Sequence, residues 1–137
     1  MKRLLFSFLL VLPGLNGWCQ GNPGQASLTW NYTRLYNGRN QEELTTAGQL
    51  VSYPAQKIDW VQNNGAYTDS YTITGVSGSW GDVSATGSIT FLVQWGTSTG
   101  TFVFTRDANG LVGELTLANP NRPGSYFKFY IASVSPN

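Results

Sequence analysis

Histidine is absent from the 137-residue chain, cysteine occurs once, and only 11% of the residues are charged. Without histidine, Ser-His-Asp and Cys-His catalysis are excluded, and so are most transition-metal sites. We therefore expect no metal, no cofactor and no assignable catalytic residue. If Lys2 and Arg3 are removed with a leader, six basic residues face seven acidic ones, a net charge of −1. Proteins that bind nucleic acids or anionic membranes usually carry a strongly basic surface. This composition provides none, so neither is an expected partner.

The first residues have the pattern of a secretory signal peptide. A short basic start, Met1-Lys2-Arg3, precedes the apolar run 4–12, which Pro13 and Gly14 end. This run is shorter than the roughly 20 apolar residues that a membrane-spanning helix needs. We therefore expect an exported protein, secreted or periplasmic, with no transmembrane segment in its mature chain.

Two cleavage sites fit the small residues that follow the apolar run. Cleavage after Cys19, in Gly17-Trp18-Cys19, leaves a mature chain that starts at Gln20 and has no cysteine. Cleavage after Gly17 is the second candidate. A lipid anchor on Cys19 is the minority alternative, because the bulky Trp18 departs from the small residue that normally precedes a lipidated cysteine.

Beyond residue 26, apolar and polar residues alternate with the period of two that marks half-buried strands. Residues 20–26 are expected to be a flexible lead-in, and residues 40–47 contain the one helix candidate. Short turns such as Asn63-Asn64-Gly65 and Asp107-Ala108-Asn109-Gly110 separate the strands. The pattern predicts one all-β domain over residues 27–134, an antiparallel meander of seven or eight strands. A closed barrel is favoured because it leaves no exposed edge, and a β-sandwich is the alternative.

One face of the expected strands carries most of the aromatic side chains, and this face should line or fill the barrel interior. Strand parity also places two charged residues, Arg34 and Asp69, on this face. Burying either charge alone is costly, so an inward ion pair between them is the hypothesis. The candidate ligand-binding residues are Trp30, Tyr32, Arg34, Asp69, Tyr71, Phe91, Phe104 and Phe129.

Trp80 is a separate candidate for recognition at the surface. Its neighbours are glycine, serine and aspartate, which offer little apolar sequence to bury an indole. An exposed tryptophan in a loop is a common recognition residue. The alternative is that Trp80 plugs one end of the barrel.

The leader, the meander and the inward aromatic residues resemble a small calycin-type barrel, the group that includes lipocalins and avidins. The resemblance covers about residues 27–134. The Gly-x-Trp motif of lipocalins occurs here as Gly78-Ser79-Trp80, in mid-chain, and Trp30 on the first strand lacks the glycine. The lipocalin Thr-Asp-Tyr motif corresponds to Thr68-Asp69-Ser70-Tyr71, with one extra residue. The resemblance implies capture of a small, mostly apolar molecule in the barrel mouth.

Three functions remain open from the sequence. The first is a binding protein for a small, mostly apolar ligand inside the barrel. The second is a module that recognises glycans or a protein surface through loop aromatic residues such as Trp80. The third is an enzyme that uses interior carboxylates and tyrosines.

Overall fold

A computed structural model describes residues 22–137. The expected signal peptide, both candidate cleavage sites and Cys19 lie outside these residues. The described chain forms β1 (Leu28–Asn37), β2 (Glu42–Leu44), β3 (Gly48–Tyr53), β4 (Lys57–Gln62), a 3-10 turn η1 (Asn63–Gly65), β5 (Tyr67–Ser77), β6 (Gly87–Trp95), β7 (Ser98–Asp107), β8 (Gly110–Asn119) and β9 (Arg122–Pro136).

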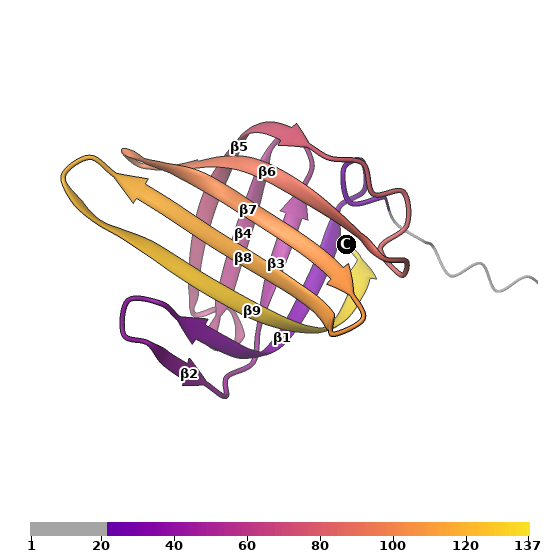
Figure 1. The fold of residues 1–137 in the computed structure, drawn as a ribbon, viewed down its shortest axis with the longest axis horizontal. Coiled ribbons are helices and arrows are strands. Elements are labelled where there is room, and N and C mark those ends of the chain that lie inside the picture. The colour runs from indigo at the N-terminus through magenta and orange to yellow at the C-terminus, as the bar shows by residue number, and fades with distance from the viewer. Residues whose placement is uncertain (1–21) are drawn as a thin grey trace, which may run out of the picture.

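Eight of the strands close into an antiparallel barrel (Figure 1). Each strand from β3 to β9 pairs with its neighbour in the sequence, and β1 closes the ring by pairing with both β3 and β9. The ninth strand, β2, pairs only with the last residues of β1 and extends that side of the barrel. The predicted all-β fold and closed meander are confirmed, and the architecture agrees with the calycin-like barrel that the sequence resembles.

The alternation read from the sequence decides which side chains fill the barrel. In β7, Phe102 and Phe104 are fully buried, while Val103 between them and the threonines on either side point the other way and are less buried. Trp30 of β1 stacks on Phe104 with ring centroids 4.1 Å apart. Contacts of this kind continue through the barrel, so its middle is a packed aromatic core.

The strand β2 occupies part of the helix candidate at residues 40–47, and no helix forms there. The chain turns at Asn37 to Gln41 and pairs back on β1, with Leu35 opposite Leu44. All three residues of β2 are exposed. A two-turn helix with so few apolar residues has no face to bury, whereas the hairpin satisfies the backbone by extending an existing strand.

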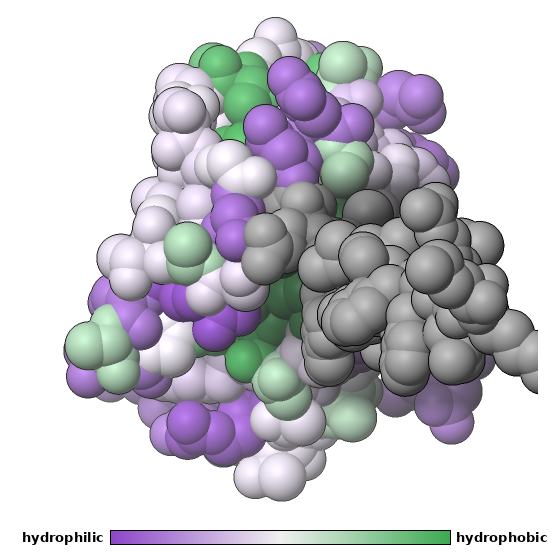
Figure 2. Space-filling view, turned by 90° about the vertical axis from the view of Figure 1, so that its right-hand side faces the viewer, coloured by the Kyte–Doolittle hydropathy of each residue, from purple (hydrophilic) through white to green (hydrophobic). Residues whose placement is uncertain are grey.

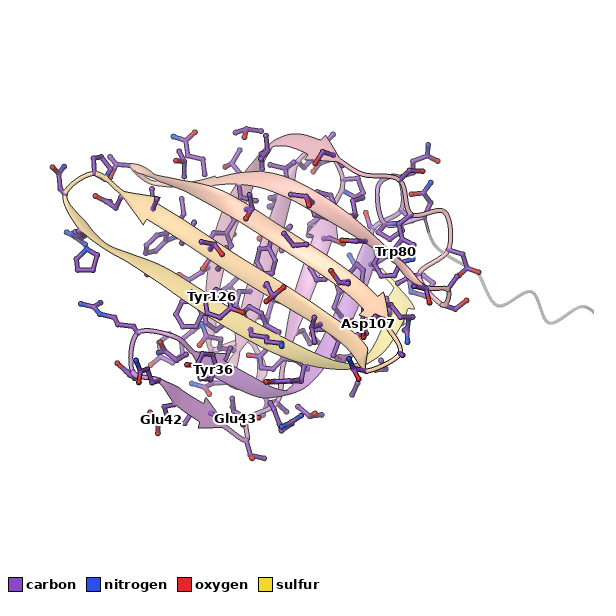
Figure 3. All side chains as sticks on the ribbon, viewed as in Figure 1. Tyr36, Glu42, Glu43, Trp80, Asp107 and Tyr126 are labelled. Carbon is purple, nitrogen blue, oxygen red and sulfur yellow. The ribbon has the colours of Figure 1, made fainter. Side chains whose placement is uncertain are left out.

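An irregularity in β1 reverses which of its alternate side chains face the barrel interior in the second half of the strand. The register against β9 shifts on both sides of Tyr32, so Thr33 is an extra residue. Trp30 and Tyr32 therefore point inward as predicted, but the next inward residue is Leu35. Tyr36 consequently lies on the outside of the barrel, where it packs edge-on against Tyr126 (Figure 3).

One end of the barrel is closed by the β5–β6 loop. Trp80 from this loop is only 3% exposed, packs beside Trp30 and donates a hydrogen bond from Nε1 to the Ala85 carbonyl, 2.9 Å away. Its indole lies over Gly87, where an added Cβ would be 2.1 Å from the ring. Residues 22–26 form a turn at the same end, with Pro23 buried.

Figure 2 shows the side of the molecule that carries the C-terminus and the β7–β8 turn. The coloured part of this surface is mostly hydrophilic or intermediate, with apolar residues in smaller patches. Among residues 22–137, no helix has both the length and the apolar character needed to cross a membrane.

Candidate functional site

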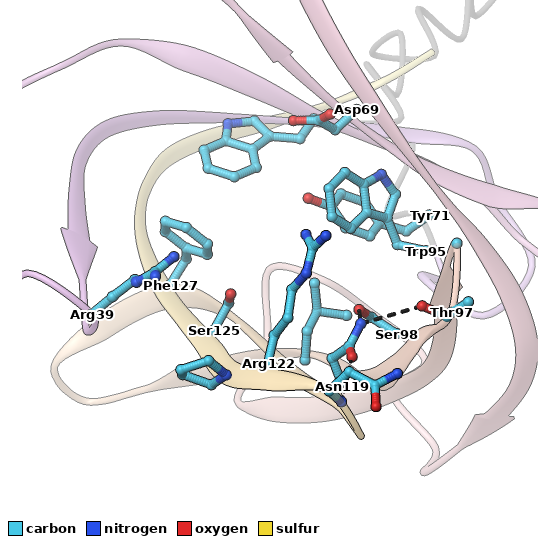
Figure 4. Close-up of a pocket in the computed structure, with 15 residues that line it drawn as sticks. Arg39, Asp69, Tyr71, Trp95, Thr97, Ser98, Asn119, Arg122, Ser125 and Phe127 are labelled. Atoms are coloured by element: carbon cyan, nitrogen blue, oxygen red, sulfur yellow. Dashed lines mark hydrogen bonds between the residues drawn. The ribbon is translucent and has the colours of Figure 1, made fainter.

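The end of the barrel opposite Trp80 is open and contains a cavity of about 780 Å³, which we call the cup (Figure 4). It forms where β4, β6 and β8 end and β5, β7 and β9 begin, together with the β1–β2 turn. The residues that line it are Arg39, Trp60, Asp69, Tyr71, Trp95, Gly96, Thr97, Ser98, Leu117, Asn119, Asn121, Arg122, Pro123, Ser125 and Phe127.

The floor of the cup is built around Trp60, which is held from several sides. Its Nε1 donates a hydrogen bond of 2.9 Å to the Tyr32 hydroxyl. Phe127 and Phe129 both pack edge-on against its ring, each with a centroid separation of 5.0 Å. Trp60 is therefore fixed before any ligand arrives, and a fixed surface loses little conformational entropy on binding.

The wall formed by β5 and β6 presents two further aromatic rings. Tyr71 is 3% exposed, whereas Trp95 at the end of β6 is 46% exposed. Their ring centroids lie 6.2 Å apart at a tilt of 38°. Trp30, Trp60 and Trp80 are all buried, so Trp95 is the one strongly exposed indole among residues 22–137.

Burial keeps the Tyr71 hydroxyl protonated. Desolvation is the main cause that raises its pKa, and the negative charge of nearby Asp69 raises it further. The neutral hydroxyl is a hydrogen-bond donor across the physiological pH range. Asp69 itself accepts a long hydrogen bond of 3.4 Å from Gln62 Nε2 and leaves most of its acceptor capacity for other partners.

Polar side chains hold the rim. Asn119 donates from Nδ2 to Ser98 Oγ at 3.0 Å and to Thr97 Oγ1 at 3.3 Å (Figure 4), which ties the end of β8 to the β6–β7 turn. Arg122, the first residue of β9, extends across the mouth toward Tyr71 and Trp95. Arg39 reaches the same cavity from the β1–β2 turn.

Asp69 is the one carboxylate among the residues that line the cup. Hydrolysis of a glycosidic bond by acid–base chemistry uses a pair of carboxyl groups, and the described cup holds no such pair. Within residues 22–137, no three histidine, cysteine, aspartate or glutamate side chains gather as a metal site would require.

The structure separates the candidate ligand-binding residues into two layers. Asp69 and Tyr71 line the cup. The remaining aromatic candidates lie in the core outside the cup lining, and Tyr32 and Phe129 support its floor through Trp60. The candidates in this core are Trp30, Tyr32, Phe91, Phe104 and Phe129.

Arg34 does not face the interior, so the prediction of an inward Arg34–Asp69 pair is wrong. The extra residue Thr33 turns Arg34 outward, where it forms an ion pair with Glu43. Its guanidinium also lies over the Tyr130 ring, 4.1 Å from the centroid. A charged side chain at this position gains two surface partners and avoids the cost of burial.

The interpretation of Trp80 as an exposed recognition residue is also wrong. Its local sequence is polar, but the residues that bury it come from the barrel end, including Trp30. Trp80 is therefore the barrel plug that the sequence left as the alternative.

Sequence reasoning missed most of the cup lining. Trp95 had a signal, because it shares the inward parity of Phe91 and Val93 and comes last on its strand. Trp60 shares a face with Ile58 in the same way. Arg39 gave no signal, since arginine in a turn is expected to be solvated.

A scan against protein-family models gave no match to this chain, and searches of curated proteins and of solved structures gave none either.

Proposed function

We propose that this protein is a small-molecule binding protein whose ligand sits in the cup at the open end of the barrel. The observation that carries the proposal is the cavity itself, of about 780 Å³ and floored by Trp60. Binding sites for small molecules are concave, largely preformed and mostly apolar, with a few polar groups that orient the ligand, and they measure roughly 300–1,000 Å³.

Two features of the described residues support binding rather than an incidental hollow. The floor residue Trp60 is fixed by three neighbours. The polar groups of the rim are held in place by the hydrogen bonds of Asn119. The calycin resemblance supports the same function, because it implies capture of a small molecule in the barrel mouth.

The proposed place of action is outside the cytoplasm, in the periplasm or the surrounding medium. The support for this part is the leader-like pattern of residues 1–19. A chain with few charges and many serine, threonine and asparagine residues is compatible with export.

Native mass spectrometry on the protein purified from its own source tests the proposal. A discrete excess mass that is lost on denaturation is the expected result, and its value begins to identify the ligand. The matched variants are Ser125→Trp, which places an indole inside the cup, and Thr116→Trp, which adds one to the outer face of β8.

The excess mass should disappear from the Ser125 variant and remain on the Thr116 variant. A ligand that stays bound to both variants occupies another site. A protein that carries no excess mass and binds neither an acidic nor a neutral fluorescent aromatic probe does not have the proposed function.

A further inference from the structure

The six basic side chains of residues 22–137 divide into two groups. Four have partners within the protein: Arg34 pairs with Glu43, Lys57 pairs with Asp59, Arg106 donates to the Val83 carbonyl, and Lys128 lies over the Tyr130 ring. The side chains of Arg39 and Arg122 have no ion pair, hydrogen bond or cation–π contact with the described residues.

Both unpartnered arginines line the cup. Asp69 is the one acidic residue that accompanies them, so the cup has a formal charge of +1 although residues 22–137 together have a charge of −1. A cleft lined by positive charge focuses the electrostatic potential at its mouth. It attracts anions in preference to cations even when the protein as a whole is slightly negative.

Arginine in such a site favours particular chemistry. The planar guanidinium donates in a fixed fork that fits the oxygens of a carboxylate, sulfonate or phosphate, and these charge-assisted hydrogen bonds are stronger than neutral ones. Figure 4 shows the Arg122 side chain extending over the cup toward Tyr71 and Trp95.

The aromatic side chains of the cup favour a ligand that also has a flat or ring-shaped group. Trp95 leaves 46% of its surface exposed, and Trp60 forms the floor. Exposed indole faces in a cavity stack on rings and bury a large apolar area at little entropic cost.

Taking these observations together, we infer that the ligand is a small ring-bearing molecule with one acidic group. The ring stacks on the exposed indole of Trp95 above the floor formed by Trp60, and the acidic group binds Arg122, with Arg39 adding positive charge. Asp69 on the β5 wall repels an acid, so the ligand enters with its acidic group toward β9. This inference rests on the proposed function and specifies its ligand class.

Two fluorescent probes of the same ring skeleton test the inference. 1-Anilinonaphthalene-8-sulfonate carries a sulfonate, and N-phenyl-1-naphthylamine has the same rings without it. Titrations of each probe are compared for the unaltered protein, Arg122→Gln and Arg39→Gln, with Arg34→Gln as the matched control outside the cup.

The sulfonate probe should bind at least about tenfold more tightly than the neutral probe, because a charge-assisted hydrogen bond contributes more than a neutral one. Arg122→Gln should weaken the sulfonate probe by about tenfold or more and the neutral probe by less than about twofold. Arg34→Gln should change neither, and added salt should weaken only the sulfonate probe.

The possible failures separate the two proposals. If both probes bind equally, are insensitive to Arg122→Gln and are lost from Ser125→Trp, the cup binds ligands but the inferred acidic group is wrong. If neither probe binds, the inference is overturned, and the proposed function is overturned with it when the purified protein also carries no excess mass. If the sulfonate probe survives Ser125→Trp, it binds elsewhere and the inference is again overturned.

Discussion

Replacing Trp80 with alanine tests whether the closed end of the barrel is a structural plug. The indole is 3% exposed, contacts the core through Trp30 and hydrogen-bonds to the Ala85 carbonyl. The substitution removes these contacts and leaves a cavity between the β5–β6 loop and the aromatic core. It changes nothing that lines the cup at the other end.

The expected cost follows from the position of the indole. Tryptophan-to-alanine changes in cores destabilise proteins by about 3–5 kcal/mol. Trp80 lies in a loop that can partly collapse into the space, so we expect the lower end, about 3 kcal/mol. For a domain of this size, 1 kcal/mol corresponds to about 4 °C in melting temperature, so the expected fall is about 12 °C.

The assay combines thermal and urea unfolding with titration of the neutral naphthylamine probe well below the melting temperature. Trp95→Ala is the matched control, because Trp95 is 46% exposed and lines the cup. It should cost about 1 kcal/mol or less in stability and weaken the probe severalfold. Trp80→Ala should show the reverse: a large loss of stability and unchanged binding.

Either of two results would refute this reasoning. A Trp80→Ala protein as stable as the original would mean that the loop does not seal the barrel. A folded Trp80→Ala protein that no longer binds the probe would place the binding site at the closed end, as the rejected recognition hypothesis required.

Three further predictions concern stability. Gly100→Ala should lose at least about 3 kcal/mol by urea unfolding, because its Cβ would lie 1.8 Å from the Thr116 carbonyl oxygen. The control is Gly81→Ala, whose Cβ meets nothing within 4 Å and which should change stability little. Arg34→Gln should cost less than about 1 kcal/mol in the same assay, since its ion pair is exposed, and a larger loss would contradict that assignment. The free energy of unfolding should fall as the pH rises above about 10, because unfolded tyrosine then loses its proton while folded Tyr71, whose pKa burial raises, keeps it. Tyr71→Phe should make this fall shallower in urea titrations at successive pH values, and an unchanged slope would argue against the buried hydroxyl.

The period-two alternation was sufficient to predict the barrel and most of its core. Phe102 and Phe104 point inward because parity continues without interruption along β7. Parity failed in β1, where an extra residue at Thr33 moved Arg34 to the surface. A bulge depends on pairing with a strand about a hundred residues away, so the local sequence holds no sign of it.

The site was harder to predict because it depends on how deeply the barrel is filled. Trp30 and Trp60 have the same alternation signal, yet Trp30 lies in the packed core and Trp60 forms the floor of the cup. Trp80 shows the converse, since its polar neighbours suggested exposure and the far end of the barrel buries it. Depth along the barrel axis is a tertiary property that no single strand encodes.

The closure of the ring by β1 and β9 has a consequence for the order of folding. Residues on these strands are joined across 102 positions of sequence, as in the contact between Asn31 and Ser133. Contacts of such high sequence separation form late and slow the search for the native state. Until β9 has docked, the remaining strands are an open sheet with two unpaired edges and an exposed aromatic face, a state prone to aggregation. Arg122 and Phe127 also arrive with this strand, so the cup is completed only at the step that removes the last free edge.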